Sequence, residues 1–226
     1  MTSSSNRQDK TAPLLVLASG SPRRSQILGE AGIPFEVIVS GIDELTRPGE
    51  RPEDLALRLA SEKCLDVATR LPADPPRPVL GADTIVVSVD DEVLGKPNNE
   101  AHAALLLEKI VGTTHRVMTG VAVAWTDGRS FGTSDPDPDP DPDPSGTLTC
   151  LGTSFVTMRS ATFEELVEYV AVGESLDKAG GYALQGEGAR FIVGVEGSRT
   201  NVIGLPIDET RELLRQAGLP AAGLGQ

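Results

Sequence analysis

Signals for strands and helices alternate along the chain, beginning with an apolar run at Leu14–Ala18 that is typical of a short strand. The tight turn Ser19-Gly20-Ser21 follows this run. Ser21 can cap a helix that begins at Pro22 and ends before Gly32, because proline suits the first helical position and glycine suits the residue after the last turn. The segment therefore predicts a strand, a turn and a helix in immediate succession.

The rest of the chain continues this alternation. Leu55, Leu59 and Val67 share one face of a predicted amphipathic helix over residues 52–71, and Lys63 interrupts that apolar face. Further strands are predicted at 35–39, 79–81, 85–89, 93–96, 117–125, 147–158, 191–195 and 201–203, with a hairpin between the third and fourth of these. Further helices are predicted from Asn98 or Asn99 to Ile110, from a capping box at Thr162 and Glu165, and from Pro206 to near Gly218.

Length and charge limit the functions that this chain can have. With 226 residues and 39% hydrophobic content, it is long enough to bury a sizeable core, as one large domain or as two small lobes. A formal net charge of -13 argues against general binding to nucleic-acid polymers or anionic membranes. The apolar run at 14–18 is too short for a secretory leader or a membrane span. We therefore expect a disordered polar tail at residues 1–12 and a cytoplasmic protein.

Cysteines and histidines are too few to build a zinc site or a disulfide scaffold. Cys64 and Cys150 form no CxxC pair, and His102 and His115 are the two histidines. This composition indicates a reducing compartment, and it predicts that any metal is bound by oxygen.

One low-complexity segment separates two predicted strands. An Asp-Pro pair is repeated five times from Asp135 to Pro144. Proline has no backbone donor and the aspartates repel one another, so an extended, solvated insertion over 134–146 is predicted at a hairpin tip. A tolerated loop insertion explains the segment more simply than a docking or calcium-attracting role, for which the sequence supplies no geometry.

Arg23 and Arg24 are unusual because they follow the start of a predicted helix, where the backbone already presents positive charge. An anion at this turn would reverse the sign of that interaction, since the free N–H groups, Ser19, Ser21 and two guanidinium groups would all face it. The alternative is that both arginines lie on a solvated face or pair with carboxylates. The residue types alone favour neither interpretation.

Asp83 is a lone carboxylate within an apolar segment that otherwise predicts a buried strand. Burying a carboxylate without partners is costly, so a general base or metal ligand is favoured over a chance position on an edge strand. Lys63 and Lys96 are the cations available to pair with it. Either lysine alone would more often extend from the surface into solvent.

Six segments occur in a specific order between residues 14 and about 215: Leu17–Arg24, Glu62-Lys63, Gly81–Thr84, Leu94–Pro97, Asp177–Tyr182 with Gln185-Gly186, and Gly204–Pro206. In this order they resemble the Maf family of nucleoside triphosphate pyrophosphatases. The resemblance implies an α/β fold like that of the inosine triphosphatases, with a mixed sheet and two lobes around a central cleft. It further implies a single domain over 13–218, a C-terminal tail at 219–226 and a homodimer.

The same resemblance assigns roles to individual residues. Asp83 matches the family's general base, and Glu44 would share a divalent cation (Mg, Mn or Co) with it. The triphosphate pocket would be lined by Ser19, Arg23, Arg24, Lys63 and Lys96. Arg23, Thr84 and Gln185 together resemble the subgroup that prefers dTTP and UTP, because a glutamine amide can read the imide edge of thymine or uracil in both directions.

The implied reaction is hydrolysis between the α- and β-phosphates, giving a nucleoside monophosphate and pyrophosphate. The alternative from another class is a nucleotide-binding regulator of cell division without significant turnover, and a third is a phosphatase that releases single phosphates. The sequence departs from the family pattern at the Asp-Pro tract, at Cys64 and at Arg199. None of these departures involves Asp83.

Overall fold

A computed structural model describes residues 14–129, 131 and 146–219. The expected N-terminal tail, nearly all of the Asp-Pro insertion and residues 220–226 lie outside this part of the chain. The elements, in chain order, are β1 Leu15–Leu17, α1 Pro22–Glu30, β2 Phe35–Val37, α2 Pro52–Arg70, β3 Pro78–Val87, β4 Val93–Leu94, α3 Glu100–Glu108, β5 Thr114–Trp125, β6 Leu148–Met158, α4 Phe163–Val170, η1 Ala179–Gly181, η2 Glu187–Phe191, β7 Ile192–Glu196, α5 Arg199–Ile203 and α6 Ile207–Gln216.

These strands form one mixed sheet, which confirms the expected α/β fold. The strand order is β2-β1-β3-β5-β6-β7, and β4 pairs with the far end of β3. The pairs β1 with β2 and β1 with β3 are parallel, whereas the pairs made by β4, β5, β6 and β7 are antiparallel. The long strands β3, β5 and β6 therefore run through the whole molecule and connect its two ends.

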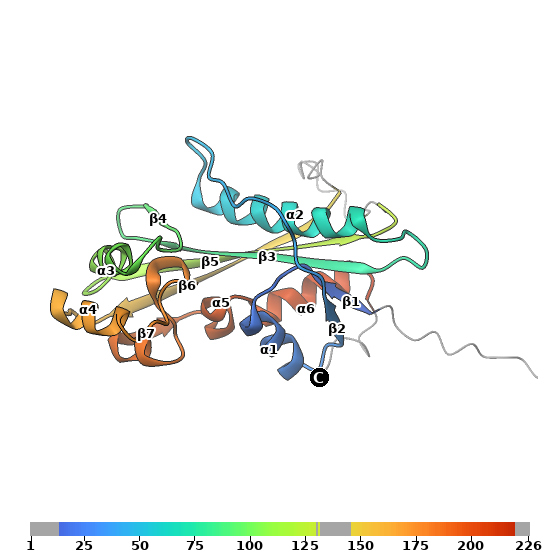
Figure 1. Cartoon of the computed structure of the whole chain (residues 1–226). Coiled ribbons are helices and arrows are strands. Elements are labelled where there is room, and N and C mark those ends of the chain that lie inside the picture. The colour runs from blue at the N-terminus through green and yellow to red at the C-terminus, as the bar shows by residue number, and fades with distance from the viewer. Residues whose placement is uncertain (1–13, 130, 132–145, 220–226) are drawn as a thin grey trace, which may run out of the picture.

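The helices cover both faces of the sheet. Figure 1 shows α2 on one face and α1, α5 and α6 on the other. On the face opposite α2, one apolar cluster includes Leu28, Leu80 and Leu214 at the β1 end, and a second includes Leu107, Tyr169 and Phe191 at the β4 end. The sheet therefore carries two separate cores on this face, one at each end of the long strands.

The edge of β3 is left open in the middle of the strand. β1 pairs with β3 at Val79 and Leu80, and β4 pairs with it only from Val86 onward. Asp83 and Thr84 lie in the interval between these partners and, being neighbours in a strand, point to opposite faces of the sheet. The same interval lies beyond the carboxyl end of β1, which is where open α/β sheets usually bind ligands.

Two glycines let α2 pack directly against this part of the sheet. A Cβ atom at Gly81 would collide with the carbonyl oxygen of Ala60, and one at Gly120 would collide with that of Ala56. Gly120 is the cross-strand partner of Asp83. This close approach places Lys63, one helical turn after Ala60, against the Asp83 side chain.

Most predicted elements are present, including the Asn99 cap of α3 and the capping box of α4. The prediction of a strand at 201–203 was wrong, because this segment belongs to helix α5. The Ser198 side chain accepts a hydrogen bond from the Asn201 amide and caps that helix. Leu219, expected in a tail, is buried in the core at the β1 end. No helix in the described part of the chain has the length and apolarity that a membrane crossing requires.

Candidate active site

A cavity of about 770 Å³ opens at the gap in the β3 edge. Its walls come from the β1–α1 turn, α2, the middle of β3, the β4 turn, the segment around η1 and the end of α5. Every residue that the sequence placed in the site lines this cavity: Ser19, Arg23, Arg24, Glu44, Lys63, Asp83, Thr84, Lys96 and Gln185. The fold thus brings together residues that lie up to 166 positions apart in the chain.

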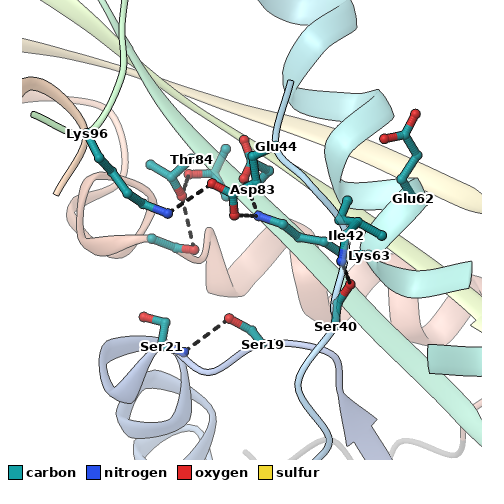
Figure 2. A network of polar contacts seen from close by, with 12 residues as sticks. Ser19, Ser21, Ser40, Ile42, Glu44, Glu62, Lys63, Asp83, Thr84 and Lys96 are labelled. Carbon is teal, nitrogen blue, oxygen red and sulfur yellow. Dashed lines mark hydrogen bonds and ion pairs between the residues drawn. The ribbon is translucent and has the colours of Figure 1, made fainter. Parts of the chain in front are cut away.

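Lys63 lies between two carboxylates on the α2 side of the gap. Its Nζ atom is 2.5 Å from Asp83 Oδ1 and 2.6 Å from Glu44 Oε1. Lys96 approaches Glu44 from the β4 side, with 2.9 Å between Nζ and Oε2 (Figure 2). The side chains of Lys63 and Asp83 are only 10% and 8% exposed, so the acid-base pair is shielded from bulk water.

The charge of Glu44 is held by these two ammonium groups. Burial alone would raise its pKa, but the hydrogen bonds and charges of Lys63 and Lys96 outweigh burial and lower the pKa to about 2. Glu44 is therefore a carboxylate throughout the neutral range. Glu62, the sequence neighbour of Lys63, points away from this network and pairs with Arg47 and Arg58 instead (Figure 2).

Arg24 is a buried guanidinium that no carboxylate of the described residues pairs with. Each of its three nitrogens donates to a neutral oxygen: Nε donates to the Gly204 carbonyl at 2.8 Å, Nη1 to Ser19 Oγ at 2.9 Å and Nη2 to Thr84 Oγ1 at 3.1 Å. Burial lowers the pKa of Arg24, and the more distant charges of Asp83 and Glu44 only partly oppose that effect. A buried cation held in place without a counter-ion is suited to an anionic ligand.

Arg23 differs from Arg24, because it pairs with a carboxylate, which is the alternative that the sequence left open for both arginines. Its Nη1 atom is 3.2 Å from Asp177 Oδ2, and the two side chains are 31% and 66% exposed. Lys178 binds the other oxygen of Asp177 at 2.5 Å. A pair of this exposure contributes little to stability, so breaking it costs little free energy.

The cavity is cationic although the protein is acidic. Five cationic side chains and three anionic ones line it, a net charge of +2 where the whole chain carries -13. The cationic side chains are Arg23, Arg24, Lys63, Lys96 and Lys178, and the anionic ones are Glu44, Asp83 and Asp177. Such a local inversion of sign concentrates polyanions at one place on the protein.

The turn before α1 adds neutral donors to this charge. The expected cap by the Ser21 side chain is not formed. Instead, the Ser21 amide donates to Ser19 Oγ at 3.3 Å, and Ser19 Oγ also accepts from Arg24. With its oxygen accepting twice, the Ser19 hydroxyl hydrogen is left to donate to a ligand, beside the unpaired amides of the first helical turn.

Another part of the cavity wall is apolar. It is formed by the end of β3, β4, the segment after η1 and α5, and includes Val86, Leu94, Tyr182, Leu184 and Val202. Gln185 lines the cavity from the same segment. A cavity with a cationic part, an apolar part and one amide matches the chemical division of a nucleotide into phosphates and base.

Sequence reasoning missed several residues of the cavity. Asp177, Lys178 and Tyr182 belong to a motif that supported the family resemblance, but no role was assigned to them. Behind Tyr182 lies the buried His115, whose Nε2 atom is 2.7 Å from the phenol oxygen. The signal that could have found this pair is the placement of a histidine within an apolar strand.

The buried His115 makes the stability of the folded protein dependent on pH. It is 1% exposed, and burial lowers its pKa to about 4 from the usual 6.5. Between these values the unfolded chain binds more protons than the folded one, so stability falls as pH falls. We expect the free energy of unfolding to drop by about 2 to 3 kcal/mol between pH 7 and 4.5 through this group. Urea unfolding of wild type and His115→Phe between pH 7 and 4.5 measures this drop. Profiles of the free energy of unfolding against pH that run parallel in the two proteins would contradict the assignment to His115.

The carboxylates fit the divalent cation that the family resemblance implies. Glu44 and Asp83 contact the same ammonium group, so the two carboxylates lie close together on either side of Lys63 Nζ. Mg²⁺ is typically bound by one or two carboxylates together with substrate phosphates. Within the described ranges, no group of three or more His, Cys, Asp or Glu side chains could hold a metal ion. The donor set therefore suits a cation that is coordinated jointly with a phosphorylated ligand.

Comparison with known proteins places this cavity in a defined family. The family model for Maf-like proteins matches residues 14–217, so the chain belongs to the Maf family. It is 45% identical over 200 residues to the dTTP/UTP pyrophosphatase of Escherichia coli O157:H7, covering 88% of this chain and 91% of that protein. The dTTP/UTP pyrophosphatase of Shigella dysenteriae serotype 1 (strain Sd197) is 44% identical over the same shares of both chains.

A crystal structure of a nucleoside-triphosphatase/dITP/XTP pyrophosphatase from Mycobacterium abscessus is also similar. It has 12% identity and a TM-score of 0.39 over 90% of this chain and 94% of that chain. This degree of structural similarity is too low to carry an argument about fold or function.

Proposed function

We propose that this protein hydrolyses dTTP and UTP to the nucleoside monophosphate and pyrophosphate. The observation that carries the proposal is the buried Arg24 guanidinium, which has no carboxylate partner among the described residues and faces a cavity of net positive charge. The names of relatives that are 44% and 45% identical supply the substrates.

Arg24, Ser19 and the first turn of α1 supply the donors for the triphosphate. Arg24 is already positioned by hydrogen bonds to Ser19 and to Thr84 in the sheet, so little conformational entropy is lost when a ligand binds. Arg23 and Lys96 would exchange Asp177 and Glu44 for phosphate oxygens. Phosphoryl transfer depends mainly on such positioning and charge stabilisation.

Asp83 is the proposed general base. Its carboxylate would take a proton from a water molecule, whose oxygen then bonds to the α-phosphorus while the bond to the bridging oxygen of the β-phosphate breaks. Lys63, 2.5 Å from Asp83, holds the carboxylate in one orientation and offsets negative charge in its surroundings. Pyrophosphate leaves with the bridging oxygen, and the monophosphate keeps the oxygen of water.

Glu44 and Asp83 would hold a divalent cation, which, when bound, polarises phosphate oxygens and neutralises their charge. For the nucleobase, Gln185 offers one donor and one acceptor beside apolar side chains, which suits the imide edge shared by thymine and uracil. A cytoplasmic location and a homodimer remain predictions from the sequence.

Product analysis tests the proposed function. The purified chain is incubated with dTTP and Mg²⁺ or Mn²⁺, and we expect dTMP and pyrophosphate in equal amounts. Tight binding of dTTP without any product would favour the nucleotide-binding regulator. Formation of dTDP and single phosphate would contradict cleavage between the α- and β-phosphates and would indicate a phosphatase.

A further inference from the structure

A hydrogen-bond chain leads from Arg24 into the sheet. Arg24 Nη2 donates to Thr84 Oγ1 at 3.1 Å, and Thr84 Oγ1 lies 3.0 Å from Thr119 Oγ1. Thr119 Oγ1 donates to the Asn201 carbonyl at 3.1 Å. A hydroxyl group has one hydrogen, so Thr119, which uses its hydrogen on Asn201, must accept from Thr84. The chain therefore runs in one direction, from the guanidinium to a backbone carbonyl.

The far end of this hydrogen-bond chain, the Asn201 carbonyl, is held in place by its surroundings. Thr119 is the direct cross-strand partner of Thr84 in the β3–β5 ladder and is fully buried. Asn201 is also fully buried, and its side chain donates to the Val117 carbonyl at 2.9 Å and to Ser154 Oγ at 3.0 Å. Two strands and helix α5 therefore hold the last acceptor in place.

We propose that Thr119 is a positioning residue for the phosphate-binding arginine. It does not line the cavity, so it acts only through Thr84 and Arg24. By accepting the Thr84 hydrogen, it leaves a lone pair of Thr84 directed at the guanidinium. This inference rests on the proposed function only in that Arg24 binds phosphate.

Thr84 has a second possible acceptor, the Gly204 carbonyl, and this is why its hydrogen must be directed by Thr119. Thr84 Oγ1 also lies 3.4 Å from the Gly204 carbonyl, which already accepts from Arg24 Nε at 2.8 Å. Without Thr119 as acceptor, the Thr84 hydroxyl would turn its hydrogen to the Gly204 carbonyl, and the lone pairs of Thr84 would then change direction relative to the guanidinium. The guanidinium would then lose its single orientation, whereas the Asn201 carbonyl would still accept from the Gly204 amide. The fold is therefore expected to tolerate the change.

Thr119→Val and Thr119→Ser form a matched pair, because valine removes the hydroxyl at nearly constant volume and serine keeps it. Inorganic tripolyphosphate is the probe, and its binding is measured by titration calorimetry at fixed Mg²⁺. We expect Thr119→Val to weaken binding about three- to tenfold, as for the loss of one net hydrogen bond, and Thr119→Ser to stay within about twofold. The kcat/KM for dTTP should fall by at least the same factor in Thr119→Val and stay within about twofold in Thr119→Ser.

A double-mutant cycle separates positioning from general damage to the core. In a Thr84→Val background the hydrogen-bond chain is already broken, so Thr119→Val should add no further loss of tripolyphosphate binding. Additive losses, equal losses in the valine and serine variants, or unchanged binding in Thr119→Val would each overturn the proposal. If the Thr119→Val protein does not fold, Thr119→Ala is used in its place.

The same measurements distinguish this inference from the proposed function. Wild type that binds tripolyphosphate but does not hydrolyse dTTP would contradict the enzymatic activity, while the valine and serine comparison would still test Thr119. Wild type that does not bind tripolyphosphate would overturn the positioning role, because Arg24 would then have no phosphate to bind.

Discussion

Asp83→Asn is expected to reduce pyrophosphate release from dTTP by at least about a hundredfold, because an amide cannot take the proton of the attacking water. Binding of dTTP in the absence of a divalent cation should change only a few-fold, since the proposed phosphate donors lie on other residues. The fold should persist as well, because Lys63 retains Glu44 as a charged partner at 2.6 Å. Steady-state pyrophosphate release and calorimetric titration with dTTP measure the two effects.

Glu62→Gln is the matched control for this experiment. It removes a carboxylate next to Lys63 in the sequence, but the Glu62 side chain pairs with Arg47 and Arg58 outside the cavity. Turnover in this variant should equal that of wild type. Undiminished turnover in Asp83→Asn, or an equal loss in both variants, would remove Asp83 from the proposed mechanism.

Arg24→Met is expected to lower kcat/KM for dTTP by about 100- to 1,000-fold, the scale found when one preorganised donor to a developing charge is removed. Its effect on stability should be small. The variant loses three hydrogen bonds to neutral oxygens but no longer buries an uncompensated charge, so we expect the free energy of unfolding to stay within about 1 kcal/mol of wild type. Urea unfolding and initial-rate kinetics measure these quantities.

Arg24→Lys separates charge from geometry in the same position. Lysine keeps the positive charge but cannot reach Gly204, Ser19 and Thr84 with one planar group, so an activity between those of wild type and Arg24→Met is expected. Tripolyphosphate should raise the melting temperature of wild type and leave that of Arg24→Met unchanged. An Arg24→Met protein that is fully active would show that the buried guanidinium serves only the fold.

The local part of the site could be predicted from the sequence because its signals are local. Pro22 and Gly32 delimit α1, and four-residue spacing places Lys63 on the apolar face of α2. Asp83 could be recognised because a carboxylate within an apolar strand is costly without partners. These features depend on hydrogen bonding and burial within one element, which a single segment of sequence records.

The remainder depends on contacts between distant segments. The pairing of Arg23 with Asp177 joins residues 154 positions apart, and that of His115 with Tyr182 joins residues 67 apart. Neither partner carries a local signal for the other. Residues 201–203 of helix α5 were predicted as a strand because Val202 and Ile203 are β-branched, whereas the Ser198 cap and the buried Asn201 side chain decide the conformation of this segment.

The most direct test of the account is to hydrolyse dTTP with the wild-type protein in water enriched in ¹⁸O and to weigh both products by mass spectrometry. If Asp83 directs water to the α-phosphorus, one ¹⁸O atom appears in dTMP and none in pyrophosphate. Label in pyrophosphate, with unlabelled dTMP, would place the attack on the β-phosphorus and contradict the arrangement of base and phosphate donors proposed for this cavity.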